Sequence, residues 1–428
     1  MKLAKLSLAA IVVAGLATST FAASDTLADA FKNGKVNGEL RAWYFDRDVD
    51  NAPAKTGSIF NSGVMLGYVT DAFYGLTFGA TVQSNYAPFA DTEAKTAFKG
   101  DLYGSGAVLS EAYLAYNISK TTLKVGRQFI SSPLVSGSGS RMIKESFEGA
   151  LLINTDLPAT TLIAGYVSKF QGRTTGAFGA SADDSDIPEF TKTGIFPGTP
   201  SAVSAVGLYF DGAYTAAVIN SSITNLTLIG QYAVVNDVAD AADVDVYHLE
   251  GNYVIPMSGF KLGLDAVYRA SKTGTALDVH NLEGNYMAGR VSAKGLAGFD
   301  LSFAYGSSDK SDDLIAGMGN GADNLYTGTV IRGGSNTYAK DTDSYLFAAK
   351  YDFSKIGVAG LSALAQYAVA EQDVTDTDYK TIHASVAYAI PALKGLSVAL
   401  QYETQDKDVG SAATVTTDEY RFMANYKF

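Results

Sequence analysis

The sequence predicts an all-β protein, a transmembrane antiparallel β-barrel of about eighteen strands. Three observations predict this fold: an export signal, repeated ten-residue runs of alternating polarity, and links that alternate between short and long. The composition agrees, since the 428 residues include 43 Gly, 26 Tyr and 22 Phe but only 9 Pro. The chain has no cysteine, which excludes a disulfide scaffold and a thiol-ligated metal. Its net charge of −12 argues against a nucleic-acid partner.

The N-terminus has the layout of a secretory signal peptide. Lysines at positions 2 and 5 precede an apolar run from Leu6 to Leu16, and alanines at positions 22 and 23 offer a cleavage site. We expect residues 1–22 to be removed and residues 23–428 to form a single barrel. Cleavage leaves 30 basic and 44 acidic residues, a net charge of −14. The apolar run is too short for a membrane helix, so the mature protein is periplasmic, secreted or an outer-membrane barrel.

The alternation of polar and apolar residues along the chain favours an outer-membrane barrel over a periplasmic or secreted protein. Between Tyr420 and Phe428 every second residue is apolar or aromatic, with Arg421 and Asn425 among the residues between them. Similar runs recur along the chain, each close to the roughly ten residues that a tilted strand needs to cross a membrane. The expected strands cover residues 36–45, 61–70, 75–85, 108–118, 121–130, 145–154, 160–170, 202–219, 225–235, 244–254, 260–270, 280–292, 299–307, 342–352, 360–370, 379–390, 395–405 and 417–428.

The links between these strands alternate in length. Short links such as 119–120 and 391–394 alternate with long ones, of which 171–201 and 308–341 are the largest. Outer-membrane barrels place short turns at the periplasmic end and long loops outside. We keep 202–219 as one strand, because splitting it at Asp211-Gly212 would give an odd number of strands.

A β-propeller is the competing all-β fold, since the pentapeptide at 249–253 recurs at 282–286 and propellers also repeat at regular periods. A propeller does not need tyrosines at its strand ends, whereas a barrel uses them as girdles at the two membrane interfaces. The tyrosines expected in such girdles are Tyr68, Tyr116, Tyr166, Tyr268, Tyr305, Tyr367 and Tyr402.

One block of motifs resembles the OprD-type outer-membrane porins. The resemblance rests on Leu109–Tyr113, Leu123–Gln128, Pro133-Leu134, Ser140–Ile143 and Phe147–Gly149. The epsilon-proteobacterial, Campylobacter-like major outer-membrane porins are the nearer match, because Met1–Leu8 also resembles their signal peptides. The resemblance implies eighteen strands and a third outer loop, about 130–145, that folds inward to narrow the pore. The chain departs from the family at Lys144, where the family often has proline.

The candidate lumen residues follow from parity and from this resemblance. Charges of both signs share the inward parity, which a water-filled channel tolerates and a dry core does not. Arg127 enters through the family motif alone, because it shares the parity of outward Leu123 and Val125 and by pattern lies near the rim or at a bulge. The expected constriction and lumen residues are Arg41, Glu111, Lys124, Arg127, Arg141, Lys144, Glu148, Arg269 and Arg421.

Metal binding and enzyme chemistry have less support. Two outward loops share the spacing Asp-x-x-Asp-x-Asp, and clustered carboxylates suit Ca²⁺, although solvated acidic loops are the simpler interpretation. The carboxylates concerned are Asp240, Asp243, Asp245, Asp373, Asp376 and Asp378. We expect no other cofactor. Only three histidines are present and no Gly-x-Ser-x-Gly motif, so a barrel hydrolase is the least favoured interpretation.

The sequence therefore predicts an outer-membrane porin for passive diffusion of ions and small hydrophilic solutes. The alternative is an adhesin or structural barrel that acts through its large acidic loops. The expected partners are outer-membrane lipid, lipopolysaccharide and the barrel-assembly machinery. A homotrimer would need an apolar outer stripe without girdle aromatics, which the pattern does not separate from a lipid-facing surface.

Tyr426 and Phe428 form the expected insertion signal at the end of the last strand. We expect deletion of Phe428 to leave the chain in the periplasm or degraded, because the closing strand loses its terminal aromatic anchor. Heat-modifiable barrel in outer-membrane fractions measures the effect. Normal amounts of that species would contradict the prediction.

Overall fold

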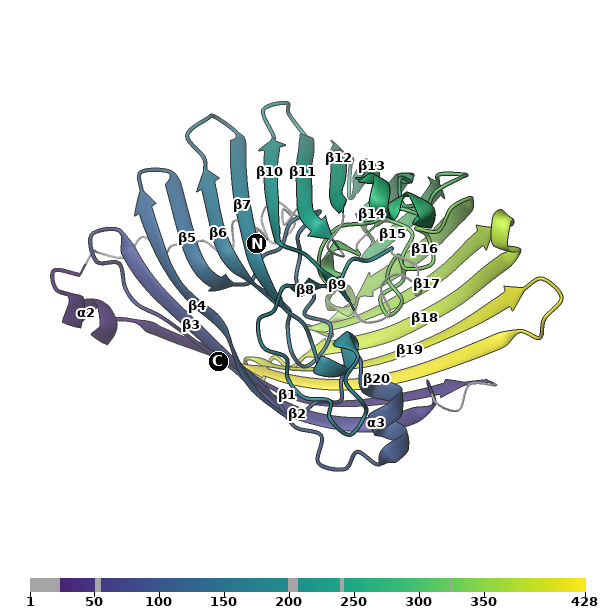
Figure 1. Cartoon of the computed structure of the whole chain (residues 1–428), viewed down its shortest axis with the longest axis horizontal. Coiled ribbons are helices and arrows are strands. Elements are labelled where there is room, and N and C mark those ends of the chain that lie inside the picture. Colours follow the sequence, from purple (N-terminus) through teal and green to yellow (C-terminus); the bar gives the residue numbers. More distant parts are fainter. Residues whose placement is uncertain (1–23, 51–54, 199–206, 239–241, 324) are drawn as a thin grey trace.

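The computed structural model describes residues 24–50, 55–198, 207–238, 242–323 and 325–428, and in this part of the chain eighteen antiparallel strands close into one barrel (Figure 1). The barrel closes because β1 pairs with both β2 and the last strand, β20. The expected signal peptide, residues 1–22, lies outside the described residues. The described helices are all too short or too polar to cross a membrane.

The expected number of barrel strands is confirmed. In chain order the strands are β1 Lys35–Val49, β2 Gly57–Val69, β3 Leu76–Asn85, β4 Gly106–Ile118, β5 Thr121–Gln128, β6 Ser146–Asn154, β7 Thr160–Gln171, β10 Gly212–Asn220, β11 Leu226–Val238, β12 Ala242–Pro256, β13 Lys261–Thr273, β14 Asn285–Leu296, β15 Phe299–Ser308, β16 Thr342–Asp352, β17 Leu361–Gln372, β18 Thr377–Ala389, β19 Leu396–Val409 and β20 Val415–Lys427. Two short helices, α2 Leu27–Lys32 and α3 Thr92–Phe98, flank them.

Two expected strands begin several residues later than predicted. The strand expected at 202–219 begins at Gly212 as β10; residues 202–206 lie outside the described part. The segment before it forms β9, Leu208–Tyr209, which pairs with β8, Thr193–Gly194, in a separate small sheet inside the preceding loop. The strand expected at 280–292 begins at Asn285, because residues 275–280 form a 3-10 helix.

The outer face of the barrel is apolar and carries paired tyrosines. Neighbouring strands bring tyrosines directly opposite one another in register, and their ring centroids lie 4.7–5.2 Å apart. The pairs are Tyr166–Tyr214, Tyr232–Tyr247, Tyr305–Tyr345 and Tyr402–Tyr420. Tyrosine rings with an apolar body and a polar hydroxyl suit the membrane interface.

Described residues of three long loops pack inside the barrel. Loop 129–145 follows β5, loop 172–211 follows β7, and loop 309–341 follows β15. Their buried residues, such as Leu134, Phe196 and Met318, form one cluster with inward residues of the wall such as Val167 and Val244. The wall of β6–β12 is therefore apolar on the inside where the loops rest on it.

The last strand ends against the first. The backbone N–H of Phe428 donates to the carbonyl of Gly38 at 3.1 Å, and the N–H of Gly38 donates to the carbonyl of Phe428 at 3.0 Å. The Phe428 ring stacks on Tyr426, whose side chain faces outward. A Cβ at Gly38 would lie 2.4 Å from the Phe428 ring, so glycine is what allows this close approach.

Candidate pore constriction

Loop 129–145 is fixed to the barrel wall by buried polar side chains. Arg41 of β1 donates from Nη1 to the carbonyls of Arg141 and Met142, at 3.1 and 2.9 Å. Gln83 of β3 makes a two-way contact with the backbone of Lys144, accepting from its N–H and donating to its carbonyl, both at 2.9 Å. These contacts satisfy backbone groups that the irregular loop would otherwise bury without partners.

The same loop reaches the far wall. Gln231 of β11 accepts a hydrogen bond from the backbone N–H of Leu134 at 3.0 Å and donates to the hydroxyl of Ser132 at 2.9 Å. Because β3 and β11 lie in different parts of the barrel wall, these anchors stretch the loop across the lumen. The inward fold implied by the family resemblance is thus present, with side chains of β1, β3 and β11 as its supports.

Six arginines gather where loop 129–145 meets the wall of β1, β19 and β20. We call them, with their carboxylate partners, the arginine cluster. The arginines are Arg41, Arg47, Arg141, Arg173, Arg332 and Arg421, and the carboxylates are Glu39, Asp101, Glu145, Glu403 and Glu419. The cluster therefore combines side chains of the wall with side chains of four loops.

Glu419 is the central carboxylate of this cluster. Its Oε1 lies 2.6 Å from Nη2 of Arg421, and its Oε2 lies 3.0 Å from Nε of Arg47 and 3.8 Å from Nη2 of Arg332. The Glu419 side chain is fully buried, whereas that of Arg332 is 23% exposed. Arg332 comes from loop 309–341, so this carboxylate links the wall to that loop.

Asp101, in the loop before β4, joins a second pair of arginines. Its Oδ2 lies 3.0 Å from Nε of Arg141 and 3.4 Å from Nη2 of Arg47. Burial alone would raise the pKa of Asp101, but the guanidiniums of Arg141 and Arg47 outweigh it and hold that pKa below its usual range. Asp101 is therefore an anion in the neutral pH range and fixes the direction of the Arg141 side chain.

A smaller group of charges lies beside the cluster. Lys124 is buried with its Nζ 3.3 Å from Oε1 of Glu111 and 3.6 Å from the ring centre of Tyr113. Lys144 lies with Nζ 4.2 Å from the ring centre of Phe129. Burial lowers the pKa of Lys144, and Arg41 and Lys124 lower it further against the opposing effect of Glu111.

Arg269 faces inward as expected, but it is an anchor and not an open lumen charge. It is 1% exposed, and its Nη1 donates to the carbonyls of Ala316 and Ala322 at 2.8 and 2.7 Å. Both acceptors belong to loop 309–341, which covers the arginine. The sequence placed Arg269 on the correct face but gave no signal that this loop folds over it.

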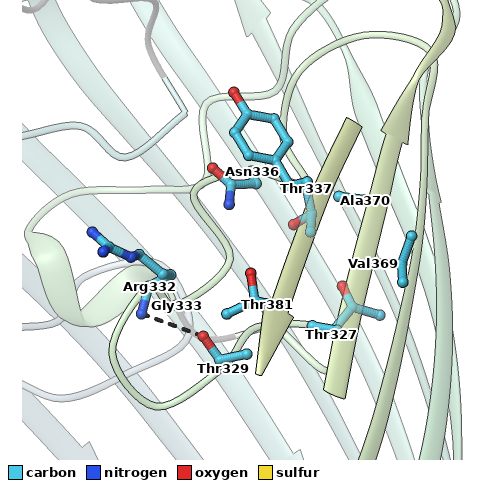
Figure 2. A pocket seen from close by; sticks show the side chains of 11 residues that line it. Thr327, Thr329, Arg332, Gly333, Asn336, Thr337, Val369, Ala370 and Thr381 are labelled. Carbon is cyan, nitrogen blue, oxygen red and sulfur yellow. Dashed lines mark hydrogen bonds between the residues drawn. The ribbon is translucent and has the colours of Figure 1, made fainter. Parts of the chain in front are cut away.

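Loop 309–341 meets the wall of β17 and β18 across polar contacts. Figure 2 shows Thr327 and Thr329 of the loop near Thr381 of β18 and Val369 and Ala370 of β17. They line a cavity of about 20 Å³. A polar cavity of that size holds about one water molecule, so hydration can complete the contact between loop and wall.

Comparison with known proteins agrees with this architecture. A sequence model described as "outer membrane porin, OprD family" matches residues 107–428, three quarters of the chain. The chain belongs to the OprD family of outer membrane porins. The porin therefore lies in the bacterial outer membrane, as predicted, and it is a channel for small solutes and not an enzyme. A search among curated proteins finds no match.

Solved structures share the fold of this porin at low sequence identity. OpdO of Pseudomonas aeruginosa is 19% identical, covers 94% of this chain and 98% of its own, and superposes with a TM-score of 0.73. OccK9 (OpdG) of the same organism is 20% identical, with 93% and 99% covered and a TM-score of 0.76. OccAB3 of Acinetobacter baumannii is 17% identical, with 93% and 99% covered and a TM-score of 0.76.

Arg127 and Glu148 do not face the lumen of the porin, which corrects the interpretation of Arg127 from the family motif and the prediction of Glu148 from strand parity. In register, Arg127 lies opposite Glu148 and both share the outward parity of Val125 and Leu152. The rule that places polar residues inside fails here for a physical reason. The apolar loops fill this part of the lumen, so Phe147 points inward among them and its charged neighbour Glu148 points outward.

The acidic loops of the porin do not form a metal site among the described residues. No three aspartate, glutamate or histidine side chains converge there on one point. Asp240 lies outside the described part. Asp243 accepts from the backbone N–H of Asp237, and Asp245 accepts from the hydroxyl of Tyr232, so these two carboxylates have separate protein donors. Asp373, Asp376 and Asp378 likewise do not converge on one point.

Several residues of the arginine cluster were missed by sequence reasoning. Arg47 and Glu419 pair directly in register and share the inward parity of Arg41 and Arg421. Glu419 lies within the expected strand 417–428 and Arg47 lies two residues beyond the expected strand 36–45, so the same parity would have found both. Arg173 and Arg332 lie in loops, where no periodicity applies. Their place follows only from how the loops fold.

Glu145 joins the three inward loops at one carboxylate. It is fully buried; its Oε2 accepts from the backbone N–H groups of Ser138 and Asn320, each at 2.9 Å, and its Oε1 lies 3.3 Å from Nε of Arg173. The Asn320 amide also donates to it. One carboxylate therefore holds loop 129–145, loop 172–211 and loop 309–341 together.

We expect Glu145→Gln to loosen all three loops, because it leaves the buried Arg173 guanidinium unpaired, a cost of about 3–5 kcal/mol. Single-channel recordings should show larger and noisier conductance, and limited proteolysis should cut within 309–341 sooner. Glu189→Gln is the matched control, since Glu189 is an exposed glutamate of loop 172–211. Unchanged conductance noise in Glu145→Gln would contradict the role of this junction.

Proposed function

We propose that this porin passes small hydrophilic solutes by diffusion and that its arginine cluster favours solutes with a carboxylate. The observation that carries the proposal is the position of the cluster, where loop 129–145 narrows the lumen against β1 and β20. A guanidinium presents paired N–H donors that match the two oxygens of a carboxylate. A solute that carries this group can replace its water contacts there.

Two sets of charges act on a permeating ion in opposite directions. The acidic residues of the outward loops attract cations to the mouth, but this attraction fades beyond a Debye length of about 8–10 Å. The arginines act at short range in a confined space, where screening is weaker. We therefore propose a weak preference for cations at low salt, combined with close contact for anionic groups at the narrow point.

The balance within the cluster limits its strength as an anion site. Five carboxylates face the six arginines, so the cluster has a formal net charge close to +1. Most of its guanidinium groups are buried, and Arg332 is 23% exposed. A solute carboxylate would therefore be steered by a few accessible N–H groups, which suits fast passage better than tight binding.

We expect Arg141→Ala to increase cation selectivity and to raise the uptake of uncharged solutes, because a positive charge and its volume leave the narrow passage. Reversal potentials in a salt gradient and liposome swelling with neutral sugars measure the two effects. Lys350→Ala is the matched control, because Lys350 lies on β16 near the short-turn end, away from the cluster. Unchanged reversal potentials in Arg141→Ala and Lys144→Ala would place the selectivity elsewhere.

Planar-bilayer recording of the purified protein tests the channel itself. Steady conductance steps support diffusion through the lumen. A silent bilayer, with the barrel intact by circular dichroism, would instead support the adhesin alternative, in which the large acidic loops bind another surface.

We also propose the nearest relatives of this porin, its route of insertion and its oligomeric state. Its nearest relatives are the epsilon-proteobacterial porins, an assignment supported by the signal-peptide resemblance at Met1–Leu8. Its insertion uses the barrel-assembly machinery, supported by the outward aromatic residues Tyr426 and Phe428. It assembles as a homotrimer, which needs an apolar outer stripe without girdle aromatics. We propose no cofactor for transport, and calcium only as a counter-ion of the acidic loops.

A further inference from the structure

Three charged side chains on neighbouring strands form a row on the outer face of the barrel. Arg127 of β5 lies opposite Glu148 of β6, and Glu148 lies opposite Lys169 of β7. Nε of Arg127 is 3.2 Å from Oε2 of Glu148, and Nζ of Lys169 is 3.2 Å from Oε1. One carboxylate serves two cations, so the row has a net positive charge.

The row lies at the edge of the apolar band that is nearer the long loops. On the same strands and the same face, the next outward residues toward the short-turn end are Val125, Ala150 and Tyr166. Tyr166 belongs to the tyrosine girdle and pairs with Tyr214. The two cations therefore stand where the lipid-facing surface gives way to water, the depth at which lipid phosphates lie.

Both cations remain open to a ligand on the outside. The side chains of Arg127 and Lys169 are 36% and 42% exposed, although each already contacts Glu148. The guanidinium of Arg127 also lies 4.5 Å from the ring centre of Phe190, which belongs to loop 172–211. This ring holds the guanidinium in place from one side. Nε donates to Glu148 and Nη1 donates to the carbonyl of Leu109 at 3.5 Å, so Nη2 is the nitrogen left for a ligand.

Other outward lysines at this end of the described strands are balanced by carboxylates. Lys272 lies opposite Asp245 in register. Lys380 lies opposite Asp406 and its Nζ is 3.9 Å from Asp408. On the described strands, the row of β5, β6 and β7 is thus the outward group at this height in which cations outnumber carboxylates.

We propose that this row binds a phosphate group of lipopolysaccharide in the outer leaflet. A phosphate oxygen accepts from the Arg127 guanidinium and another from the Lys169 ammonium, on either side of Glu148. The acyl chains of the same molecule lie on the apolar surface below, formed by residues such as Leu123, Val125 and Leu152. The phosphate supplies the charge that the row lacks, and the chains supply apolar contact.

A second copy of the chain fits the row less well. The outward aspartates Asp343 of β16 and Asp418 of β20 lie across the barrel from β5–β7 in strand order. Those of β12 lie nearer, but Asp243 already accepts from the N–H of Asp237 and Asp245 from the hydroxyl of Tyr232. In a closed trimer the two contact faces of one subunit lie on neighbouring sides, so surfaces across the barrel cannot meet. A lipid phosphate needs no such geometry.

Binding of diphosphorylated lipid A to the purified barrel in detergent tests the proposal, measured by native mass spectrometry. Arg127→Gln combined with Lys169→Gln should weaken binding about tenfold or more, because two charged hydrogen bonds to phosphate are lost. Glu148→Gln should strengthen binding, because the competing carboxylate is removed. Lys272→Gln combined with Lys380→Gln is the matched control at the same height and should leave binding unchanged.

Single-channel conductance and heat modifiability confirm that each variant still forms the barrel. The proposal is overturned if the Arg127/Lys169 double variant binds lipid A as tightly as the unchanged protein, or if dephosphorylated lipid A binds equally well. Full competition by millimolar inorganic phosphate would assign the row to free phosphate and reject the lipid. A change of oligomeric state in the double variant, with lipid binding unaltered, would make the row an interface between copies.

Discussion

The structure of the pore depends on buried polar side chains that satisfy the backbone of the inward loops. Irregular backbone is tolerated at membrane depth only where protein or water meets its hydrogen-bonding groups. Arg41, Gln83, Gln231 and Arg269 meet this need by bonding directly to loop N–H and carbonyl groups. Charged and amide residues of the lumen thus hold the loops in place, in addition to any effect that they have on permeating ions. The shape of the passage follows from which wall residues can reach across to a loop.

The electrostatics of the passage follow from the same arrangement. A row of free arginines would repel itself and would need counter-ions, whereas Glu419 and Asp101 keep the arginines close at a small net charge. Such a cluster presents oriented donors instead of a strong net field. In the function proposed above, these donors contact a solute carboxylate without holding it tightly, which suits passage through a channel.

Much of the fold could be predicted from the sequence, because side chains of a barrel strand alternate between lipid and lumen. Apolar residues therefore recur at every second position, as at Leu123 and Val125 or at Tyr420 and Phe422. The site could be predicted only in part. Arg41 and Arg421 lie on strands and obey that period, but Arg332 reaches the same place from a loop. The assignment of polar residues to the inside fails at Phe147 and Glu148. The inside of the wall is apolar there, so Phe147 faces the loops and the charged Glu148 faces outward. Loop packing decides these positions, and it depends on residues far apart in the chain.

The closing seam between β1 and β20 has a consequence for the order of assembly. Every other contact between described barrel strands joins strands that follow one another along the chain, so it closes a shorter loop and loses less chain entropy. The seam joins residues such as Leu40 and Tyr426, at opposite ends of the chain. It can form only after the whole sheet has curled, so it is the slow, non-local step. Until then two sheet edges stay unpaired, and a chain held at that stage is open to pairing with other strands.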